Sequence, residues 1–287
     1  MTSAGILYIA ATPIGNLGDI SRRLAETLAS VDLIAAEDTR QTRKLLTHLG
    51  LSKPLVSCHE HNEMRIAHAL VTRILGGESV ALVTDAGTPA ISDPGAIVVS
   101  EAVKAGIRVS PIPGPSSLIS ALSISGFSLD QGFIFEGFLP HKSTARDKRW
   151  TDLKDEPRVI VLLESTHRID RLISEMLRFI PSRSIVICRE LTKLHETIVR
   201  GTPDHLRESI SGSGAKGEFT VVIDMLHRAR DDHAAAPEPD RDDVLRRLAN
   251  GNSVRDIAAD LSESTGTPQR LLYRKILEIR NTGGTQT

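Results

Sequence analysis

The sequence "ATPIGNLGDISRRL", residues 11–24, joins the apolar run "GILYIAA" at residues 5–11 to the helical pattern "ISRRLAETLASV" at residues 20–31. A short apolar strand, a turn and an amphipathic helix form the repeating unit of a parallel sheet that is covered by helices. The turn contains Pro13, Gly15 and Gly18 but lacks the G-x-G-x-x-G spacing of a dinucleotide site. The stretch predicts an α/β fold whose first turn binds something other than a pyrophosphate.

The same unit recurs throughout the first 125 residues. Apolar runs at residues 31–37, 54–58, 79–87 and 107–114 predict further strands, and sequences with helical spacing separate them. Strands that are apolar along their whole length are typical of a parallel sheet with helices on both faces. We therefore expect an N-terminal α/β domain over residues 1–125.

The second half of the chain has a different pattern. It contains five further strand candidates, at residues 133–140, 158–165, 184–191, 196–202 and 217–226. Because these strands outnumber the helical patterns between them, the sequence predicts a second α/β domain with a mixed sheet over residues 126–226.

The C-terminal part differs from both domains. Residues 227–240 are charged and rich in alanine and proline, which indicates a linker. Residues 241–287 carry three short helical patterns typical of a helix-turn-helix, with Gly266 in the turn and Pro268 opening the last helix. A small helical packing domain is the alternative.

Composition limits the possible partners. The 287 residues carry a net charge of −1, so any contact with a polyanion must come from local patches. The two cysteines, Cys58 and Cys188, form no disulfide framework and fit a reducing compartment. No signal peptide or membrane span is evident, so we expect a cytoplasmic protein with no membrane partner.

The loop "VTDAGTPAISDPG", residues 83–95, is the most informative strand end. It offers hydroxyls and carboxylates but no arginine or lysine. This composition favours a small, partly cationic ligand with ribose hydroxyls over a phosphate-rich one. Ordinary turn chemistry is the alternative, because turns need glycine, proline, aspartate and serine in any case.

Eight motifs occur in a specific order within residues 5–226. They are "LYIAATPIGNLGDIS", "AAEDTRQTRKLL", "LVTDAGTPAISDPG", "PIPGPSS", "FEGFLP", "LLESTHRI", "CRELTK" with "HET" one residue later, and "GEFTVVI". Their order and spacing resemble the ribosomal RNA small subunit methyltransferases of the tetrapyrrole methylase superfamily. The resemblance implies two α/β domains of the class III methyltransferase type, with the methyl donor S-adenosyl-L-methionine in the cleft between them.

The resemblance also implies an activity and partners. A family member of this kind methylates the ribose 2′-hydroxyl of a cytidine in the decoding region of 16S rRNA within the small ribosomal subunit, and it is a homodimer. Thr88 stands where tetrapyrrole methylases carry an aspartate, which argues against a porphyrinoid substrate. A small-molecule, tetrapyrrole-type methylase is one alternative, and a non-enzymatic RNA-binding or ribosome-binding protein on the same scaffold is the other.

The resemblance places the donor contacts on loops of both domains. These residues are Pro13, Gly87, Thr88, Pro89, Ile91, Ser116, Ser117, Leu163, Leu191, Glu218 and Phe219.

A ribose hydroxyl is a weak nucleophile, so a positioned base should assist the transfer. The candidate catalytic residues are Glu37, Asp38, Arg40 and Glu190, with Glu164, His167 and Arg189 as further possibilities. Asp38 and Thr39 also fit another interpretation, because both residue types cap helices.

Basic clusters indicate where RNA phosphates would bind. The candidates are Arg43, Lys44, Lys142, Arg146, Lys148 and Arg149, with Arg270, Arg274 and Lys275 near the C-terminus. For residues 141–150 the alternative is a solvated helix with Trp150 buried. The sequence "CHEHNE", residues 58–63, matches no zinc-ligand spacing, so no metal is expected.

Overall fold

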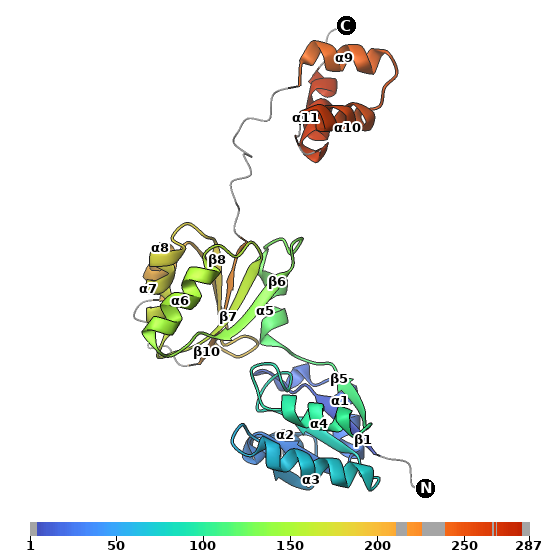
Figure 1. Ribbon diagram of the computed structural model, residues 1–287, viewed down its shortest axis with the longest axis vertical. Helices are drawn as coiled ribbons and strands as arrows, with labels where there is room; N and C mark the ends of the chain where they lie inside the picture. Colours follow the sequence, from blue (N-terminus) through green and yellow to red (C-terminus); the bar gives the residue numbers. More distant parts are fainter. Residues whose placement is uncertain (1–4, 211–216, 226–238, 266, 268, 283–287) are drawn as a thin grey trace. The chain divides into compact units, whose positions relative to one another are not determined.

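The computed structural model describes residues 5–210, 217–225, 239–265, 267 and 269–282. The chain divides into two compact units, Met1–Leu226 and His227–Thr287. The first unit contains two five-stranded sheets, each with its own helices (Figure 1).

The first sheet is entirely parallel, with the strand order β3-β2-β4-β1-β5. Its central strands β2 and β4 are buried along their whole length because helices cover both faces. The core on one face includes Leu70 of α3 and Val98 of α4, and the core on the other includes Leu28 of α1 and Leu46 of α2. The elements are β1 Ile6–Ala10, η1 Leu17–Asp19, α1 Arg22–Ser30, β2 Leu33–Ala36, α2 Thr39–His48, β3 Leu55–Ser57, α3 Glu63–Leu75, β4 Val80–Val83, α4 Ala96–Lys104, β5 Arg108–Ile112 and α5 Ser117–Ser125.

The second sheet is mixed, with the strand order β6-β7-β10-β8-β9. Only β6 and β7 run parallel, and the other neighbours are antiparallel. Trp150 of α6 and Met176 of α7 are buried against one face, and Leu122 of α5 packs against the other. The elements are β6 Phe133–Phe138, α6 Ser143–Leu153, β7 Val159–Ser165, α7 Ile169–Phe179, β8 Ile185–Arg189, β9 Thr197–Gly201, α8 Pro203–Ile210 and β10 Glu218–Ile223.

The parallel first sheet and the mixed second sheet confirm the predicted α/β fold class. Helix α5, whose Leu122 packs against the second sheet, ends at Gly126 in the left-handed conformation at φ 79°. Glycine adopts this conformation without a Cβ penalty.

The second unit is a small helical body. It consists of α9 Arg241–Ala249, α10 Val254–Thr265 and α11 Gln269–Thr282 around a core that includes Val244, Ile257 and Ile276. Gly266, Pro268 and residues 227–238 of the expected linker lie outside the described residues. Among the helices that the structure describes, none is long and apolar enough to cross a membrane.

Candidate active site

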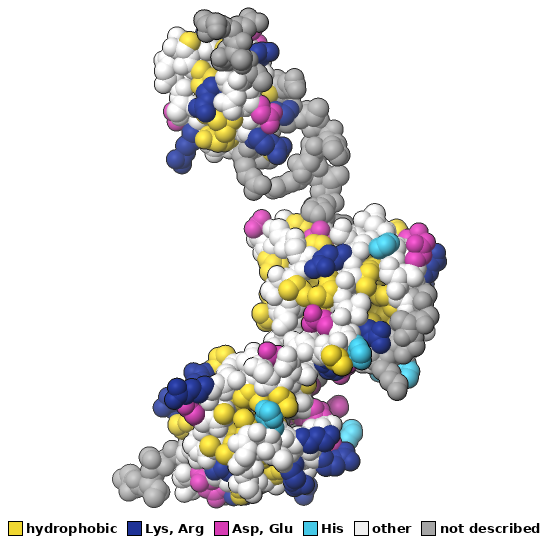
Figure 2. Space-filling view, turned by 180° about the vertical axis from the view of Figure 1, so that it is seen from behind, with side chains coloured by type: hydrophobic (Ala, Val, Ile, Leu, Met, Phe, Trp, Pro, Cys, Tyr) yellow, Lys and Arg dark blue, Asp and Glu magenta, His cyan; other side chains and the backbone are white. Residues whose placement is uncertain are grey.

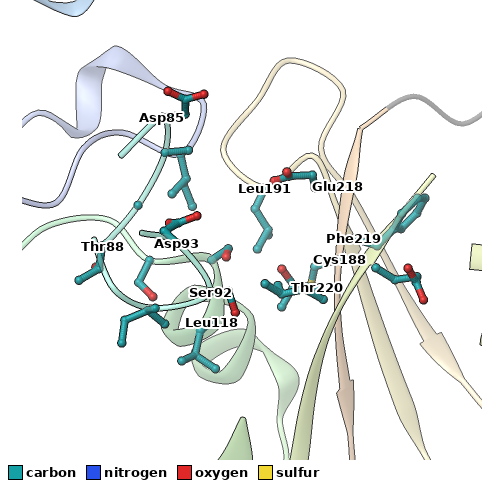
Figure 3. Close-up of a pocket in the computed structure, with 18 of the residues that line it drawn as sticks. Asp85, Thr88, Ser92, Asp93, Leu118, Cys188, Leu191, Glu218, Phe219 and Thr220 are labelled. Atoms are coloured by element: carbon teal, nitrogen blue, oxygen red, sulfur yellow. The ribbon is translucent and has the colours of Figure 1, made fainter. Parts of the chain in front are cut away.

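A cavity of about 240 Å³ lies in the first unit between strand-end loops of the first sheet and strands of the second. Figure 3 shows Thr88, Ser92 and Asp93 on one side of it, with Leu191 and Thr220 on the other. The apolar part of the wall consists of Ile14, Ile91, Leu118, Phe135, Phe138, Leu163, Leu191 and Phe219.

The turn at residues 11–16 is tied to the loop that follows β4. Thr12 N–H donates to Gly87 O at 2.9 Å, and Gly87 N–H donates to Thr12 O at 3.1 Å. Gly87 has φ +81°, a conformation that side chains other than glycine rarely adopt. The first turn therefore holds the second loop in place and contributes Ile14 to the cavity wall.

The same loop is fixed from behind by Glu63. Glu63 Oε1 accepts hydrogen bonds from Gly95 N at 2.9 Å and from Ile97 N at 2.8 Å. Helix α4 begins after Gly95, which has no side chain to cap it, so the buried carboxylate supplies the cap from α3. The short segment between Gly87 and Gly95 is thus anchored at both ends, and Ala90 and Ser92 take positive φ angles of 69° and 62°.

Three carboxyl groups of the first domain gather at the cavity. Burial raises the pKa of Asp93 to about 7, and the negative charge of Glu37 adds to the effect. Burial also raises the pKa values of Glu37 and Asp85. Asp85 N–H donates to Glu37 Oε2 at 3.2 Å, so the two strand-end loops are joined here. The site is therefore rich in negative charge and suits a cation.

Asp38 and Arg40 lie outside the cavity lining. They form an exposed ion pair at 2.6 Å, and the Arg40 hydrogen bond holds the pKa of Asp38 down at about 2. Asp38 also accepts a hydrogen bond from Arg40 N and caps α2, which confirms the N-cap interpretation. A carboxylate held so firmly in its ionised form is a poor proton acceptor.

The second domain supplies the opposite wall. Glu190 lines the cavity and pairs with Lys193 at 2.8 Å. Lys193 is the one cation among the described residues that line the cavity. At the bulge in β6, Gly137 has φ +64°, and an added Cβ would come within 2.9 Å of Ser92 Oγ. The glycine of "FEGF" therefore allows the two domains to approach closely.

The position of Arg146 differs from the prediction that this residue binds RNA phosphates. Its side chain is 0% exposed and pairs with Glu164 at 2.9 Å and with Glu175 at 2.6 Å, so it cannot reach an RNA phosphate. Glu164 lines the cavity, is 1% exposed and also pairs with Arg168 at 2.7 Å. This carboxylate is held by two guanidinium groups, which makes it a structural part of the wall.

Most of the predicted donor contacts lie at this one cavity. They are Gly87, Thr88, Ile91, Ser116, Ser117, Leu163, Leu191, Glu218 and Phe219. Pro89 is not part of the lining, and Pro13 lines a neighbouring hollow. The predicted catalytic residues Glu37 and Glu190 lie in the cavity.

Sequence reasoning missed several lining residues. Phe135 and Cys188 sit in the interior of apolar strands, where nothing in the pattern separates a wall residue from a core residue. Burial raises the pKa of the Cys188 thiol to about 11. Asp93 is one of the carboxylates that the loop at residues 83–95 offers, and its place in "SDPG", in the same loop as Asp85, is the signal that could have marked it as a site residue.

The segment around His59 has a structural role. Asn62 Oδ1 accepts a hydrogen bond from His59 N at 2.8 Å, and the Asn62 amide donates to Ser57 O at 3.1 Å. Cys58 is completely buried in the core of the first domain. In the part of the chain that the structure describes, no three His, Cys, Asp or Glu side chains are grouped to hold a metal ion.

Comparisons with known proteins agree on one family. A family model described as tetrapyrrole (corrin/porphyrin) methylases matches residues 6–207. Proteins named ribosomal RNA small subunit methyltransferase I from Xylella fastidiosa and Vibrio cholerae are 45% and 46% identical to this chain. The alignments cover 95% and 96% of this chain, and 99% and 95% of the relatives.

A solved structure shares the fold. Uroporphyrin-III C-methyltransferase from Thermus thermophilus, complexed with S-adenosyl homocysteine, superposes with a TM-score of 0.54 at 16% identity. The match covers 76% of this chain and 96% of that one.

Proposed function

The chain belongs to the tetrapyrrole methylase family, and we propose that it methylates the ribose 2′-hydroxyl of a cytidine in the decoding region of 16S rRNA. The proposal takes the substrate class from the relatives named ribosomal RNA small subunit methyltransferase I. The chain is a methyltransferase that uses S-adenosylmethionine, as its family indicates, and the proposal adds the acceptor to this activity.

The character of the cavity is the observation that carries the proposal. Its lining combines apolar side chains that suit an adenine ring with hydroxyls and carboxylates, and its cation Lys193 is already paired with Glu190. A phosphate would meet repulsion here, whereas a sulfonium cation and ribose hydroxyls would find acceptors. These residues fit S-adenosylmethionine.

When bound, S-adenosylmethionine would supply a methyl group on a positively charged sulfur. An attacking oxygen would take the methyl group, and the neutral sulfur would leave. We propose that Leu163, Leu191 and Phe219 hold the adenosine, and that the backbone between Gly87 and Thr88 faces the rest of the donor. The loop side is preorganised, because the loop is anchored by Thr12 and Glu63. Such alignment can supply a large share of the roughly 7–11 kcal/mol available from proximity.

The proton of the acceptor hydroxyl needs a base, and we propose Asp93 for this role. It lies in the cavity beside Glu37, and its pKa of about 7 is near neutral pH, where a general base is effective. Glu37 is the alternative. Glu190 is less suitable, because it is paired with Lys193.

The Asp93 hypothesis predicts opposite effects of pH on activity and stability. Below about pH 7 Asp93 is protonated, so kcat/KM should rise with pH up to about 7 and then level off. The folded protein keeps this proton above the ordinary carboxyl pKa of 3.8, so the free energy of unfolding should decrease as pH rises through that window. An Asp93→Asn variant should lose both dependences, with a rate roughly 10²–10⁴-fold lower.

A matched substitution is the control for that measurement. Asp155→Asn makes the same chemical change at an exposed turn beyond α6 and should leave the rate and the pH profile unchanged. If Asp93→Asn keeps the parental rate and profile, the base is another group.

Two measurements test the function as a whole. Mass spectrometry of nucleosides from small subunits incubated with the protein and labelled donor should show 2′-O-methylcytidine. Calorimetry should show that S-adenosylhomocysteine binds the parent and that Gly87→Val abolishes binding, because valine does not tolerate φ +81°. Methylation of a different atom would refute the proposed acceptor and leave the donor site intact.

The remaining expectations are a homodimer and action in the cytoplasm on the assembled small subunit. Light scattering and a comparison of naked 16S rRNA with small subunits as substrates would test them.

A further inference from the structure

Three hollows lined wholly or in part by the first domain lie next to one another. The cavity of the candidate active site, which we call the donor cavity, shares Asp85 with a second hollow of about 260 Å³, which we call the middle hollow. The middle hollow shares Lys44 with a third, open groove along α2, which we call the α2 groove. The middle hollow therefore borders both the donor cavity and the α2 groove.

The middle hollow has the lining of a nucleobase site. Pro13, Leu17 and Leu45 give it apolar walls, and Leu17 is 46% exposed although it is a large apolar side chain. Leu17 therefore has apolar surface available to cover a planar ring that enters the hollow.

The polar groups of the middle hollow comprise an acceptor and a donor. Asp85 Oδ1 accepts from Asp38 N at 3.1 Å, which fixes the carboxylate at the edge between two cavities. Figure 3 shows Asp85 apart from Thr88 and Asp93, at the margin of the donor cavity. Gln41 Oε1 accepts from Lys44 Nζ at 2.9 Å, so the amide presents its N–H donors to a ligand. The Gln41 amide can therefore donate to the O2 or N3 acceptors on the edge of a cytosine.

The α2 groove has a different character. Its lining is Arg40, Arg43, Lys44 and Thr47, so cations dominate it. Figure 2 shows Lys and Arg side chains gathered on the surface of the first domain. Such a groove suits a phosphate group of a nucleic acid backbone.

We infer that the middle hollow receives the nucleoside of the acceptor cytidine, extruded from the RNA, while the α2 groove holds the adjacent phosphate. This inference rests on the proposed function and deepens it. In a nucleotide the ribose carries the base, the 2′-hydroxyl and the phosphate, so a ribose in the middle hollow can direct its phosphate toward the α2 groove. Its 2′-hydroxyl would then point across the shared border into the donor cavity, which Asp93 lines.

The inference explains why the acceptor must leave the stack. Enzymes that modify a group inside structured RNA or DNA often place the target nucleotide in a pocket and read its edge there. Leu17 and Pro13 would cover the faces of the base, and Gln41 would bind its polar edge.

A double-mutant cycle tests this inference by binding rather than by turnover. The RNA is the smallest one that the wild-type enzyme methylates, made with 2′-deoxycytidine at the acceptor position so that no reaction occurs. A second RNA carries an abasic residue at that position. Affinities of both RNAs are measured with saturating S-adenosylhomocysteine for the wild type, Leu17→Ala and Gln41→Leu.

We expect the wild type to bind the abasic RNA roughly tenfold or more weakly than the deoxycytidine RNA. Leu17→Ala and Gln41→Leu should bind the deoxycytidine RNA more weakly and should lose most of the preference for a base, because the pocket and the base act as a pair. Donor affinity should be unchanged in both variants. Leu75→Ala and Gln131→Leu change an exposed leucine and an exposed glutamine elsewhere and should retain the full preference.

The outcomes separate the two proposals. If the wild type methylates no RNA, the proposed function fails, and the inference that rests on it fails as well. If the wild type methylates RNA but the two variants keep its full preference for a base, the acceptor base binds elsewhere. A loss of S-adenosylhomocysteine affinity in the variants would instead assign the middle hollow to the donor and overturn the inference.

Discussion

Helices α2 and α6 carry similar basic sequences, and the fold uses them in opposite ways. In "TRQTRK" of α2 the cations Arg40, Arg43 and Lys44 are exposed and line a groove. In "ARDKRW" of α6 Arg146 is completely buried between Glu164 and Glu175, and Arg149 pairs with Glu136 and Asp152. A count of basic residues therefore does not measure the charge that a helix offers to a partner.

The difference follows from helical spacing. The buried residues of α2 are Thr42, Leu45 and Leu46, and its cations lie on the other side of the helix. The buried residues of α6 are Arg146, Trp150 and Leu153, which are spaced as one stripe. Because Trp150 must be buried, the arginine four residues before it is buried with it, and two carboxylates compensate its charge.

The largest effect is expected from Arg146. An Arg146→Met variant keeps much of the side-chain volume but leaves Glu164 and Glu175 without their shared partner. Removing one member of a buried ion pair costs roughly 3–5 kcal/mol. We expect a loss of unfolding free energy of this size in urea denaturation.

Two further variants make this result specific. Arg146→Lys keeps the charge but not the planar fork that contacts both carboxylates, so its loss should be intermediate. Lys148→Met removes a cation from an exposed position of the same helix and should change stability by less than about 0.5 kcal/mol. Equal stabilities of Arg146→Met and Lys148→Met would contradict the structural role of Arg146.

The burial of Arg146 also shows what the sequence can and cannot predict. Periodicity was sufficient for the α/β class, and the family motifs located most of the cavity. The stripe of Arg146, Trp150 and Leu153 was visible in the sequence, but its carboxylate partners lie on β7 and α7 and become neighbours only in the fold. Charge clustering alone therefore gave the wrong answer at this position.

Other parts of the site depend on contacts between distant segments. Glu63 caps α4 from 32 residues away in the sequence, and no local pattern marks it for that role. The pKa of Asp93 depends on its burial and on Glu37, which belongs to another strand end. Residue types at strand ends predicted the location of the site, but their protonation and their anchors required the three-dimensional structure.

An intermediate effect is expected from α2. An Arg43→Ala/Lys44→Ala variant should keep its stability and its affinity for S-adenosylhomocysteine but bind RNA more weakly. Each lost phosphate contact should lower the slope of log affinity against log salt by roughly 0.7–0.9. Fluorescence anisotropy across a salt series should show that this slope falls by the amount expected for about two lost contacts. A parental slope would show that the α2 groove does not contact RNA.

The smallest effect is expected from the surface of α6. Lys142 and Lys148 are exposed, and with Arg146 buried and Arg149 paired they are the remaining members of the expected phosphate patch. A Lys142→Ala/Lys148→Ala variant removes as many charges as the α2 variant. Any difference in RNA binding between the two variants therefore comes from where the charges lie and not from their number. For the Lys142→Ala/Lys148→Ala variant we expect the slope of log affinity against log salt to decrease by no more than roughly 0.7–0.9, the value for one lost phosphate contact. A decrease equal to that of α2 would restore α6 as a phosphate-binding surface, with its two lysines making the contacts that sequence clustering assigned to the whole segment.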